Sequence, residues 1–315
     1  MVKKLYCKVY FLLLLGFHMA ERTRFGTAGV PPTFRLLKAK LTNVPKLLRD
    51  SGLDAFEYQA VRWGDKPQIK QQDAQAFGVE VRKHDIRLSM HGSYFINLAG
   101  KADVVSASKD RLIAGATAAD WMGAYVIVFH TGFYGKFEKS YAFNICLKAL
   151  QEVSQTIKDL GLNVKLGPET MGKKFQVGNL DEIIAICQKV EQTQLVVDWG
   201  HLHARDLGAF KKVDDIRAVA EKIESTLGSE TLQNIHCHFS KIEFTNQGER
   251  KHHPLDEPMY GPEFELLAKV LFDFKMHPTI ICETPLLDID ALKMKKMLQK
   301  VSESKANVSS QQKLF

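Results

Sequence analysis

The sequence predicts an α/β protein with a single (β/α)8 TIM barrel, and three observations lead to this prediction. The chain has 315 residues, a length at which such barrels commonly form one domain. Eight short apolar segments, rich in β-branched and aromatic residues, alternate with amphipathic stretches. The hydrophobic fraction of 45% is sufficient for a large core without disulfides. Such alternation is typical of parallel strands joined by helices.

The expected strands span residues 23–29, 55–61, 87–93, 124–132, 164–171, 195–201, 233–240 and 278–284. The amphipathic stretches include residues 33–50, 103–122, 140–160, 180–191, 213–227 and 286–301. A doubly wound open sheet is the alternative, and its usual mark is a GxGxxG turn after the first strand. Gly26 and Gly29 lack that spacing, so a closed barrel is favoured.

The two ends of the chain differ from the barrel region. Residues 1–20 form an apolar extension whose hydrophobic run is too short to span a bilayer. We interpret this extension as an over-extended start, with Met19 as an alternative first residue; a signal segment is the less favoured interpretation. The catalytic barrel then covers residues 21–303, and residues 304–315 form a polar tail.

The cysteines and the net charge indicate the compartment and the kind of partner. The five cysteines are scattered and form no CxxC pair, which argues against a disulfide framework and fits a reducing compartment. We therefore expect a cytoplasmic protein. The formal net charge of +7 favours an acidic partner such as nucleic acid, although many basic proteins bind no DNA.

Histidine and carboxylate side chains recur at the ends of six successive expected strands. They are His91, His130, Glu169, Asp198 with His201, His236 with His238, and Glu283. The carboxyl ends of the strands form the active-site face of a TIM barrel. Because buried polar groups are costly without partners, we expect metal ions here, and imidazole with carboxylate suits zinc, manganese or iron(II). The number of ligands predicts two or three ions, which is common in phosphate ester hydrolysis.

The ordered series of motifs resembles the endonuclease IV family of abasic-site endonucleases, also called AP endonuclease family 2, within the xylose isomerase-like barrels. The likeness extends from Arg24-Phe-Gly to Glu283-Thr. It is carried by His91-Gly-Ser-Tyr94, Phe129-His130-Thr-Gly132, Pro168-Glu169-Thr, Gly178-Asn179-Leu, Val197-Asp198-Trp-Gly-His201, His236 with Ser240-Lys241, His252-His253 and Glu283-Thr284. The series is specific, whereas each motif alone is weak.

The resemblance implies three zinc ions. The first would be bound by His91, His130 and Glu169. The second would share Glu169 and also be bound by Asp198, His236 and Glu283. Glu169 and Glu283 would act in catalysis.

The third zinc ion would be bound by His201 and His252 with one carboxylate. This chain departs from the family at that carboxylate. The family pattern is Asp-x-His, but Arg250 stands two residues before His252 and cannot ligate. Glu249 is the nearest substitute, so the third site depends on this exchange.

The activity implied by the resemblance is hydrolysis of the DNA phosphodiester 5′ to abasic sites, which leaves a 3′-hydroxyl. The implied partner is double-stranded DNA with abasic sites or blocked 3′ ends, bound by a monomer away from membranes. By motif match, Tyr94 and Phe95 would enter the DNA stack, and Arg62 and Lys241 would contact DNA. Without the resemblance, Tyr94 and Phe95 are better interpreted as packing residues.

Other interpretations stay open at this point. His238 and His253 are further histidines that either support the metal ligands, contact DNA or lie on the surface. A sugar or sugar-phosphate isomerase or epimerase of the xylose isomerase-like group would also place Glu, Asp and His at strand ends, around fewer ions. A non-catalytic barrel that binds metal or DNA is a third possibility.

Overall fold

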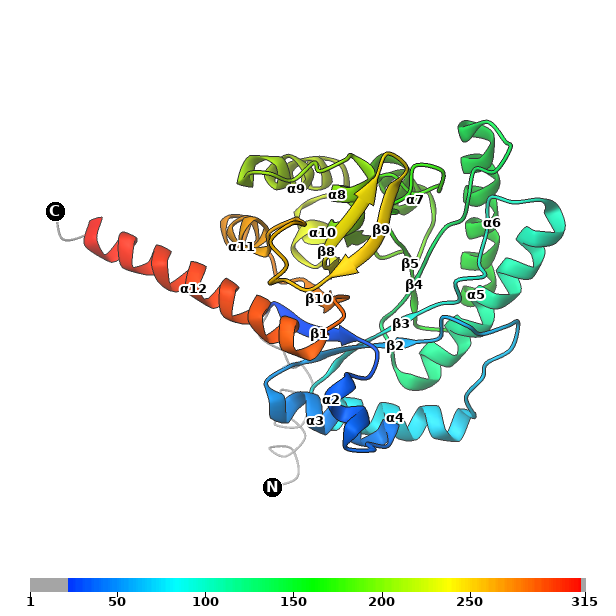
Figure 1. The fold of residues 1–315 in the computed structure, drawn as a ribbon. Coiled ribbons are helices and arrows are strands. Elements are labelled where there is room, and N and C mark those ends of the chain that lie inside the picture. The colour runs from blue at the N-terminus through cyan, green and yellow to red at the C-terminus, as the bar shows by residue number, and fades with distance from the viewer. Residues whose placement is uncertain (1–21, 313–315) are drawn as a thin grey trace, which may run out of the picture.

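The computed structural model describes residues 22–312, with side chains for residues 22–304, and shows a nearly closed parallel barrel (Figure 1). Its strands are β1 (Arg24–Ala28), β2 (Ala55–Gln59), β3 (Arg87–His91), β4 (Val126–Phe129), β5 (Lys165–Pro168), β6 (Val196–Asp198), β7 (His236–Phe239) and β10 (Thr279–Cys282). The strand order is β5-β4-β3-β2-β1-β10-β7-β6. Two isolated bridges, between Leu166 and Thr193 and between Glu169 and Val196, join the edge strands β5 and β6. The predicted barrel is confirmed.

Helices surround the barrel and bury their apolar faces against it. They are α2 (Pro32–Leu36), α3 (Val44–Ser51), α4 (Gln71–Lys83), α5 (Ala102–Met122), α6 (Lys139–Asp159), α7 (Leu180–Lys189), α8 (Trp199–Arg205), α9 (Val213–Leu227), α10 (Ser229–Gln233), α11 (Phe264–Asp273) and α12 (Asp288–Gln312), with a 3-10 turn η1 (Leu41–Asn43) before α3. In α9, for example, Ile216, Ala220 and Ile223 lie one turn apart and are buried. Among residues 22–312, no helix has the length and apolarity needed to cross a membrane.

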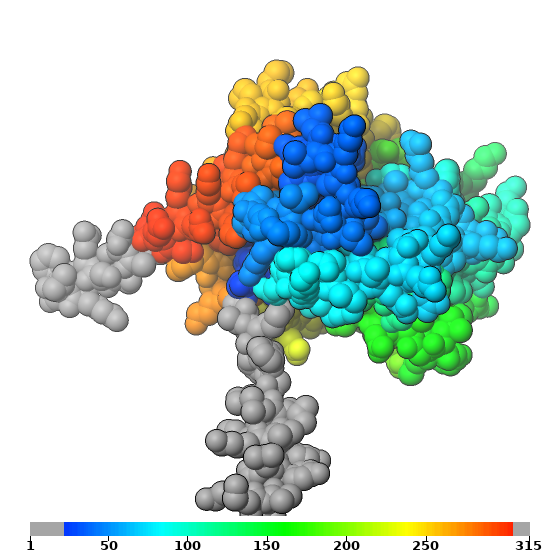
Figure 2. All heavy atoms as spheres, turned by 90° about the horizontal axis from the view of Figure 1, so that it is seen from below, coloured from blue at the N-terminus to red at the C-terminus, as the bar shows by residue number. Residues whose placement is uncertain are grey.

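The first and last elements of the barrel lie side by side. Helix α12 contacts β1, and the hydroxyl of Thr33 donates to Asp288 at 2.8 Å (Figure 1). Figure 2 shows the same neighbourhood from below, with the red C-terminal helix beside the blue N-terminal segments. Helix α12 continues to Gln312, past Ser304, where we expected a polar tail to begin. The expected extension at residues 1–20 and the alternative start at Met19 lie outside the described residues.

Two local differences from the expected elements have clear causes. The expected strand 195–201 ends at Asp198, because the carboxylate of Asp198 accepts the backbone N–H of His201 at 2.7 Å and caps helix α8. The expected helical stretch 33–50 is divided, and Pro45 lies in the first turn of the second helix, α3, where a proline is favourable.

An antiparallel hairpin that the sequence did not predict follows β7. It consists of β8 (Lys241–Thr245) and β9 (Gly248–His253). The hairpin packs on the loop after β5, where the backbone N–H of Glu249 donates to the carbonyl of Gly172 at 3.1 Å. Gly248 has φ +96°, and a Cβ there would lie 2.1 Å from that carbonyl oxygen, so only glycine permits this approach. The hairpin therefore covers part of the barrel's carboxyl end.

The contact between β1 and β2 predicts a position that cannot take a side chain. A Cβ on Gly26 would lie 2.2 Å from the carbonyl oxygen of Ala55. We expect Gly26→Ala to lower the free energy of unfolding by about 1–3 kcal/mol, since overpacking strains the sheet. At Gly64 a Cβ would meet no described atom within 4 Å, so Gly64→Ala should change the free energy of unfolding by less than about 0.5 kcal/mol. Urea denaturation of both variants is the measurement, and equal stabilities would contradict the expectation.

Candidate metal centre

The polar side chains at the strand ends meet in one place, at the carboxyl end of the barrel. Three groups of histidine and acidic residues lie there and a fourth lies deeper in the barrel, and within each group the possible ligand atoms are within 4.8 Å of one another. Their members are His91, His130 and Glu169; Glu169, Asp198, His238 and Glu283; His201, Glu249 and His252; and Glu57, His236 and His238. Parallel strands of a barrel present their carboxyl ends on one face, which explains how residues far apart in sequence converge.

The first group lies where β3, β4 and β5 end. His130 Nε2 lies 3.2 Å from Glu169 Oε2, and His91 Nε2 lies 3.6 Å from the same oxygen. His91 Nδ1 lies 2.9 Å from the backbone carbonyl of Gly92, to which it donates. This hydrogen bond leaves the Nε2 lone pair of His91 directed at the group, as in a metal-ligating histidine. The structure thus brings together the three residues expected for the first ion.

The second group shares Glu169 and adds a histidine other than the expected one. His238 Nδ1 lies 2.9 Å from Glu169 Oε1 and 3.4 Å from Glu283 Oε1, and Asp198 completes the group. His236, expected here from the resemblance, lies elsewhere, with Nε2 3.2 Å from Glu57 Oε2. Both histidines point into the barrel because they are two residues apart on β7. His238 is nearer the carboxyl end of the strand, so it reaches the group.

The third group includes the residue that replaces the family's aspartate. His201 Nε2 lies 3.4 Å from Glu249 Oε2, and His252 Nε2 lies 3.8 Å from Glu249 Oε1. In the hairpin Lys251 pairs with Glu243 and Glu249 pairs with Phe244, so Arg250 is an extra residue, a β-bulge. The bulge shifts the alternation of side chains by one residue. It therefore places Glu249 and His252 on the same face despite their three-residue spacing.

Arg250 itself turns away from the group. Its guanidinium forms an ion pair with Glu243, with Nη1 2.5 Å from Oε1. Glu243 also lies 3.3 Å from Nε2 of His253, whose ring stacks on Tyr260. His253 therefore belongs to the outer side of the hairpin.

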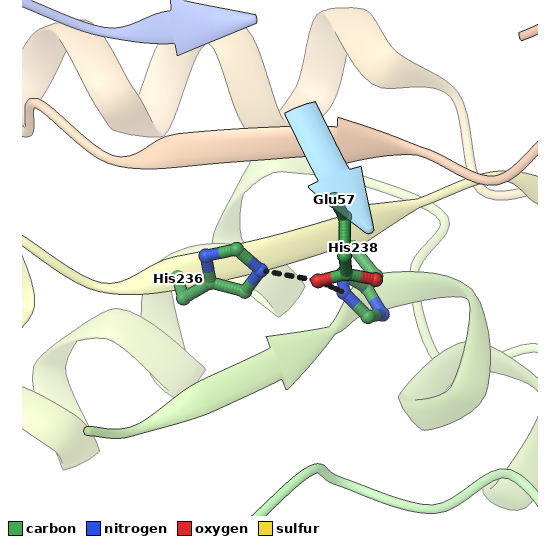
Figure 3. Close-up of side chains that lie close together, drawn as sticks. All are labelled: Glu57, His236 and His238. Atoms are coloured by element: carbon green, nitrogen blue, oxygen red, sulfur yellow. Dashed lines mark hydrogen bonds and ion pairs between the residues drawn. The ribbon is translucent and has the colours of Figure 1, made fainter. Parts of the chain in front are cut away.

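Glu57 is a buried residue of the site that the sequence reasoning missed. It lies in the middle of β2, and its Oε2 is 3.2 Å from His236 Nε2 and 3.1 Å from His238 Nε2 (Figure 3). All three side chains have no exposed surface. The only sequence signal was an acidic residue within a mostly apolar strand, where burial without partners would be costly.

The electrostatics of the site follow from many charges in a buried volume. Burial alone would raise the pKa of Glu169, but His238, His130 and His91 hold it well below its usual range. Burial, together with Asp198 and Glu169, raises the pKa of Glu283 to about 8 although His238 opposes this.

In the third group, neighbouring carboxylates raise the pKa of a histidine. Burial alone would lower the pKa of His201, but Asp198, Glu249 and Glu169 outweigh it and raise the pKa to about 10. The excess of acidic groups around this ring thus favours a positive charge at this position.

Two orphaned oxygens test whether these residues fit a metal. Glu169 Oε2 and Asp198 Oδ2 are buried and have no hydrogen-bond partner among the described residues. Buried carboxylate oxygens rarely lack a partner, and a cation satisfies them. The donors are imidazole nitrogens and carboxylate oxygens, a set that suits zinc, manganese and iron(II). The arrangement fits metal ions at the first and second groups.

Three of the residues expected to contact DNA are exposed on loops that follow the strands. Tyr94 and Phe95 project from the loop after β3 with 53% and 60% of their surface exposed, and the Tyr94 ring stacks on His130 with centroids 5.4 Å apart. Arg62 is exposed on the loop after β2. These three side chains are therefore accessible to a partner.

Lys241 differs from the expectation, because its side chain is buried. Its ammonium binds Glu263 Oε1 at 2.6 Å. A lysine directly after a barrel strand is expected on the rim, where it would meet phosphate. In this chain Lys241 is the first residue of β8, and so it belongs to the hairpin, which the sequence did not predict. A buried lysine needs a partner such as Glu263, since desolvation of the ammonium is costly.

A second exposed aromatic pair, which the sequence reasoning missed, lies on the same face. Phe133, in the loop after β4, and Phe175, in the loop after β5, stack with ring centroids 6.0 Å apart and planes 16° apart. Both rings are more than one-third exposed. Stacking shields part of each ring from water and leaves the remaining aromatic surface accessible on this face.

One family model and several curated proteins are similar to this chain in sequence. A model of the family described as Xylose isomerase-like TIM barrel matches residues 45–301. An uncharacterized protein of Methanocaldococcus jannaschii is 32% identical over 273 residues, 86% of this chain and 95% of that protein. A probable endonuclease 4 of Mycoplasma mobile is 28% identical over 200 residues, 62% of this chain and 68% of that protein.

Solved structures show the same fold with different activities in their names. Endonuclease IV from Thermus thermophilus has a TM-score of 0.63 at 18% identity and covers 84% of this chain and 94% of its own. A D-tagatose 3-epimerase-like protein has a TM-score of 0.63 at 17% identity and covers 91% of this chain and 100% of its own. At such identities the likeness shows the fold alone.

The third group predicts a metal stoichiometry that depends on Glu249. We expect Glu249→Ala to lose one equivalent of bound metal, because two histidines remain without their carboxylate. Metal analysis after dialysis is the measurement. Glu243→Ala is the matched control on the same hairpin, since Glu243 pairs with Arg250 and His253 outside the group, and it should keep the full content. An unchanged metal content in Glu249→Ala would remove Glu249 from the ligands.

The raised pKa values predict the direction of a pH effect. A ligand must lose its proton before it binds a metal. Because the pKa of His201 is raised to about 10 and that of Glu283 to about 8, metal-free protein carries these protons at neutral pH. Metal affinity should therefore rise with pH, up to about pH 8 at the group that contains Glu283 and up to about pH 10 at the group that contains His201. Calorimetric titrations in buffers of different ionisation enthalpy should show protons released on binding; uptake of protons would contradict this.

Proposed function

We propose that this chain, which belongs to the xylose isomerase-like TIM barrel family, is a metal-dependent nuclease that hydrolyses the DNA phosphodiester 5′ to abasic sites. The observation that supports this most is the presence of three neighbouring ligand groups, two of which share Glu169. Several ions around one bridging carboxylate suit an in-line displacement at phosphorus, where the attacking and the leaving oxygen both need stabilisation. The product would carry a 3′-hydroxyl.

The chain's own residues would hold the ions and orient the reactants. His91, His130 and Glu169 would hold one ion, the group with Asp198, His238 and Glu283 a second, and His201, Glu249 and His252 a third. Zinc, when bound in such sites, lowers the pKa of a water ligand to about 7 and polarises phosphoryl oxygens. Glu283 is the partly exposed member of its group, so its carboxylate would accept a hydrogen bond from the attacking water and orient it.

The rim around the ligand groups supplies features that DNA binding needs. Tyr94, Phe95, Phe133 and Phe175 are exposed aromatic residues in the loops after β3, β4 and β5. Stacking on such rings contributes about 1–3 kcal/mol per base, and a missing base lowers the cost of opening the duplex. The nearby side chains of Lys136 and Lys174 are exposed and would contact phosphates.

The ligand count separates this proposal from a sugar isomerase or epimerase. The group of Glu169, Asp198, His238 and Glu283 would by itself provide the four ligands for one ion. Such an enzyme would have no use for the groups that contain His130 and His201. Their presence favours phosphodiester hydrolysis. We further propose that the enzyme acts in DNA repair, in the cytoplasm and as a monomer.

A duplex with one tetrahydrofuran abasic analogue tests the proposal directly. Zinc-loaded protein, without magnesium, should nick this duplex 5′ to the analogue and leave the matching undamaged duplex intact. Gel analysis of an end-labelled strand gives the position of the nick. Absence of a nick together with turnover of a ketosugar would replace the nuclease by the isomerase.

Glu169→Gln tests the bridging carboxylate. In Glu169 one carboxylate oxygen faces His91 and His130, and the other faces His238. A neutral amide cannot replace this charge, so both cleavage and metal content should fall. We expect a loss of at least about 100-fold in kcat/KM. Glu191→Gln is the control, because Glu191 is 79% exposed and pairs with Lys158 away from the groups. Near-normal cleavage by Glu169→Gln would exclude the bridging role.

A further inference from the structure

We propose that Glu57 is a positioning residue that fixes the proton of His238 on Nε2 and so presents Nδ1 to the group of Glu169, Asp198 and Glu283. The proposal rests on the metal centre of the proposed function and deepens it, because it names which histidine of β7 binds the ion and through which nitrogen. It also assigns a role to the buried network of Glu57 and His236, which meets the ligand groups at His238 (Figure 3).

The two nitrogens of His238 face different partners. Nδ1 lies 2.9 Å from Glu169 Oε1 and 3.4 Å from Glu283 Oε1. Nε2 lies 3.1 Å from Glu57 Oε2, on the other side of the ring. A neutral imidazole has one N–H and one lone pair. The partner that takes the N–H therefore decides which nitrogen is left to bind a cation.

The proton positions follow from the chemistry of the neighbours. An ionised carboxylate only accepts hydrogen bonds, so His236 and His238 both donate from Nε2 to Glu57 Oε2, and in the metal-free protein His238 Nδ1 donates to Glu169 Oε1. A cation at the second group would replace the proton on Nδ1, while Glu57 keeps the proton on Nε2. His236 then accepts at Nδ1, and the hydroxyl of Tyr125, 2.5 Å away, donates to it. A phenol keeps its proton at neutral pH because its ordinary pKa is about 10. One consistent direction of hydrogen bonds thus runs from Tyr125 through His236 to Glu57.

Glu57 is fully satisfied by protein groups, unlike the carboxylates of the second group. Its Oε1 accepts from Gln59 Nε2 at 3.1 Å, and its Oε2 accepts from Ser89 Oγ at 3.0 Å and from the two histidines. By contrast, Glu169 Oε2 and Asp198 Oδ2 have no hydrogen-bond partner among the described residues. Unsatisfied oxygens mark where a cation is needed, whereas a satisfied carboxylate holds its donors in place. Glu57 therefore supports the ligand His238 and does not itself bind an ion.

This arrangement explains why two histidines on β7 have different roles. His238 Nε2 faces Glu57, and its Nδ1 faces the ligand group that contains Glu169. Both nitrogens of His236 are hydrogen-bonded to other side chains, Nδ1 to Tyr125 and Nε2 to Glu57. A carboxylate behind a metal-ligating histidine typically changes metal affinity by about 10- to 100-fold when it is removed. The same effect is expected for Glu57 at the second group.

The first experiment compares Co²⁺ binding by wild-type protein, Glu57→Gln and a matched control. We expect Glu57→Gln to weaken one Co²⁺ site by about 10- to 100-fold and to alter the visible absorption of that ion. The control is Glu182→Gln, which removes the charge of another hydrogen-bonded carboxylate, the capping residue that binds Tyr134 and the backbone of Gly178. Glu182→Gln should lose stability and keep its Co²⁺ affinities. Equal Co²⁺ affinities in Glu57→Gln and wild type would overturn the proposal.

The second experiment exchanges the two histidines and does not depend on how well Glu57→Gln folds. His238→Gln should lose one ion, whereas His236→Gln should keep the full content, since an amide N–H still donates to Glu57. Loss of an ion in His236→Gln would mean that Glu57 and His236 bind metal themselves, and would overturn the proposal. In zinc-loaded wild type, nitrogen-15 shifts should show His238 protonated on Nε2 with the metal on Nδ1; the reverse would also refute it.

These outcomes are distinct from failure of the proposed function. A protein that binds its ions as described but leaves the abasic duplex intact would refute the nuclease and retain the role of Glu57. A wild-type protein that binds no Co²⁺ would remove the metal centre, and the role of Glu57 with it.

Discussion

The buried carboxylate of Glu169 is the interaction on which the arrangement of the whole centre depends. One of its oxygens faces His130 and His91, and the other faces His238 and His201, at distances of 2.9 to 3.6 Å. A lone carboxylate in such a volume would be costly, and four surrounding imidazoles compensate only in part. Its Oε2 still lacks a hydrogen-bond partner among the described residues, so the site is arranged for cations that several groups share.

The barrel alone positions only part of this centre. Strand ends deliver His91, Glu169, Asp198 and His238, because parallel strands share one carboxyl face. The third group needs an element outside the barrel, the β8–β9 hairpin, which is anchored by the close approach of its turn to the loop after β5. The bulge within that hairpin turns Glu249 toward the site. The third ligand group is therefore coupled to the folding of an accessory segment, whereas the first two depend on the barrel itself.

Much of the fold and part of the site could be predicted from the sequence, for identifiable physical reasons. Apolar runs followed by His or carboxylate are a local pattern, so the eight strands and residues such as His130 and Glu169 could be placed. The choice between His236 and His238 could not, because both face the interior and only depth along the strand separates them. Glu57 was missed because one acidic residue in an apolar strand has no periodic signal.

The contact between Tyr94 and His130 links the two parts of the proposed function. The exposed Tyr94 ring stacks on His130 and meets His91 edge-on at 5.3 Å, so it covers the first ligand group. In the proposed nuclease this ring would also enter the DNA stack. A ring that moves into DNA must leave the histidines, and a phosphodiester bound at the first group would then use the space that the ring vacates. Recognition of a damaged site and exposure of the ligand groups would then be one motion, because the same side chain cannot occupy both positions.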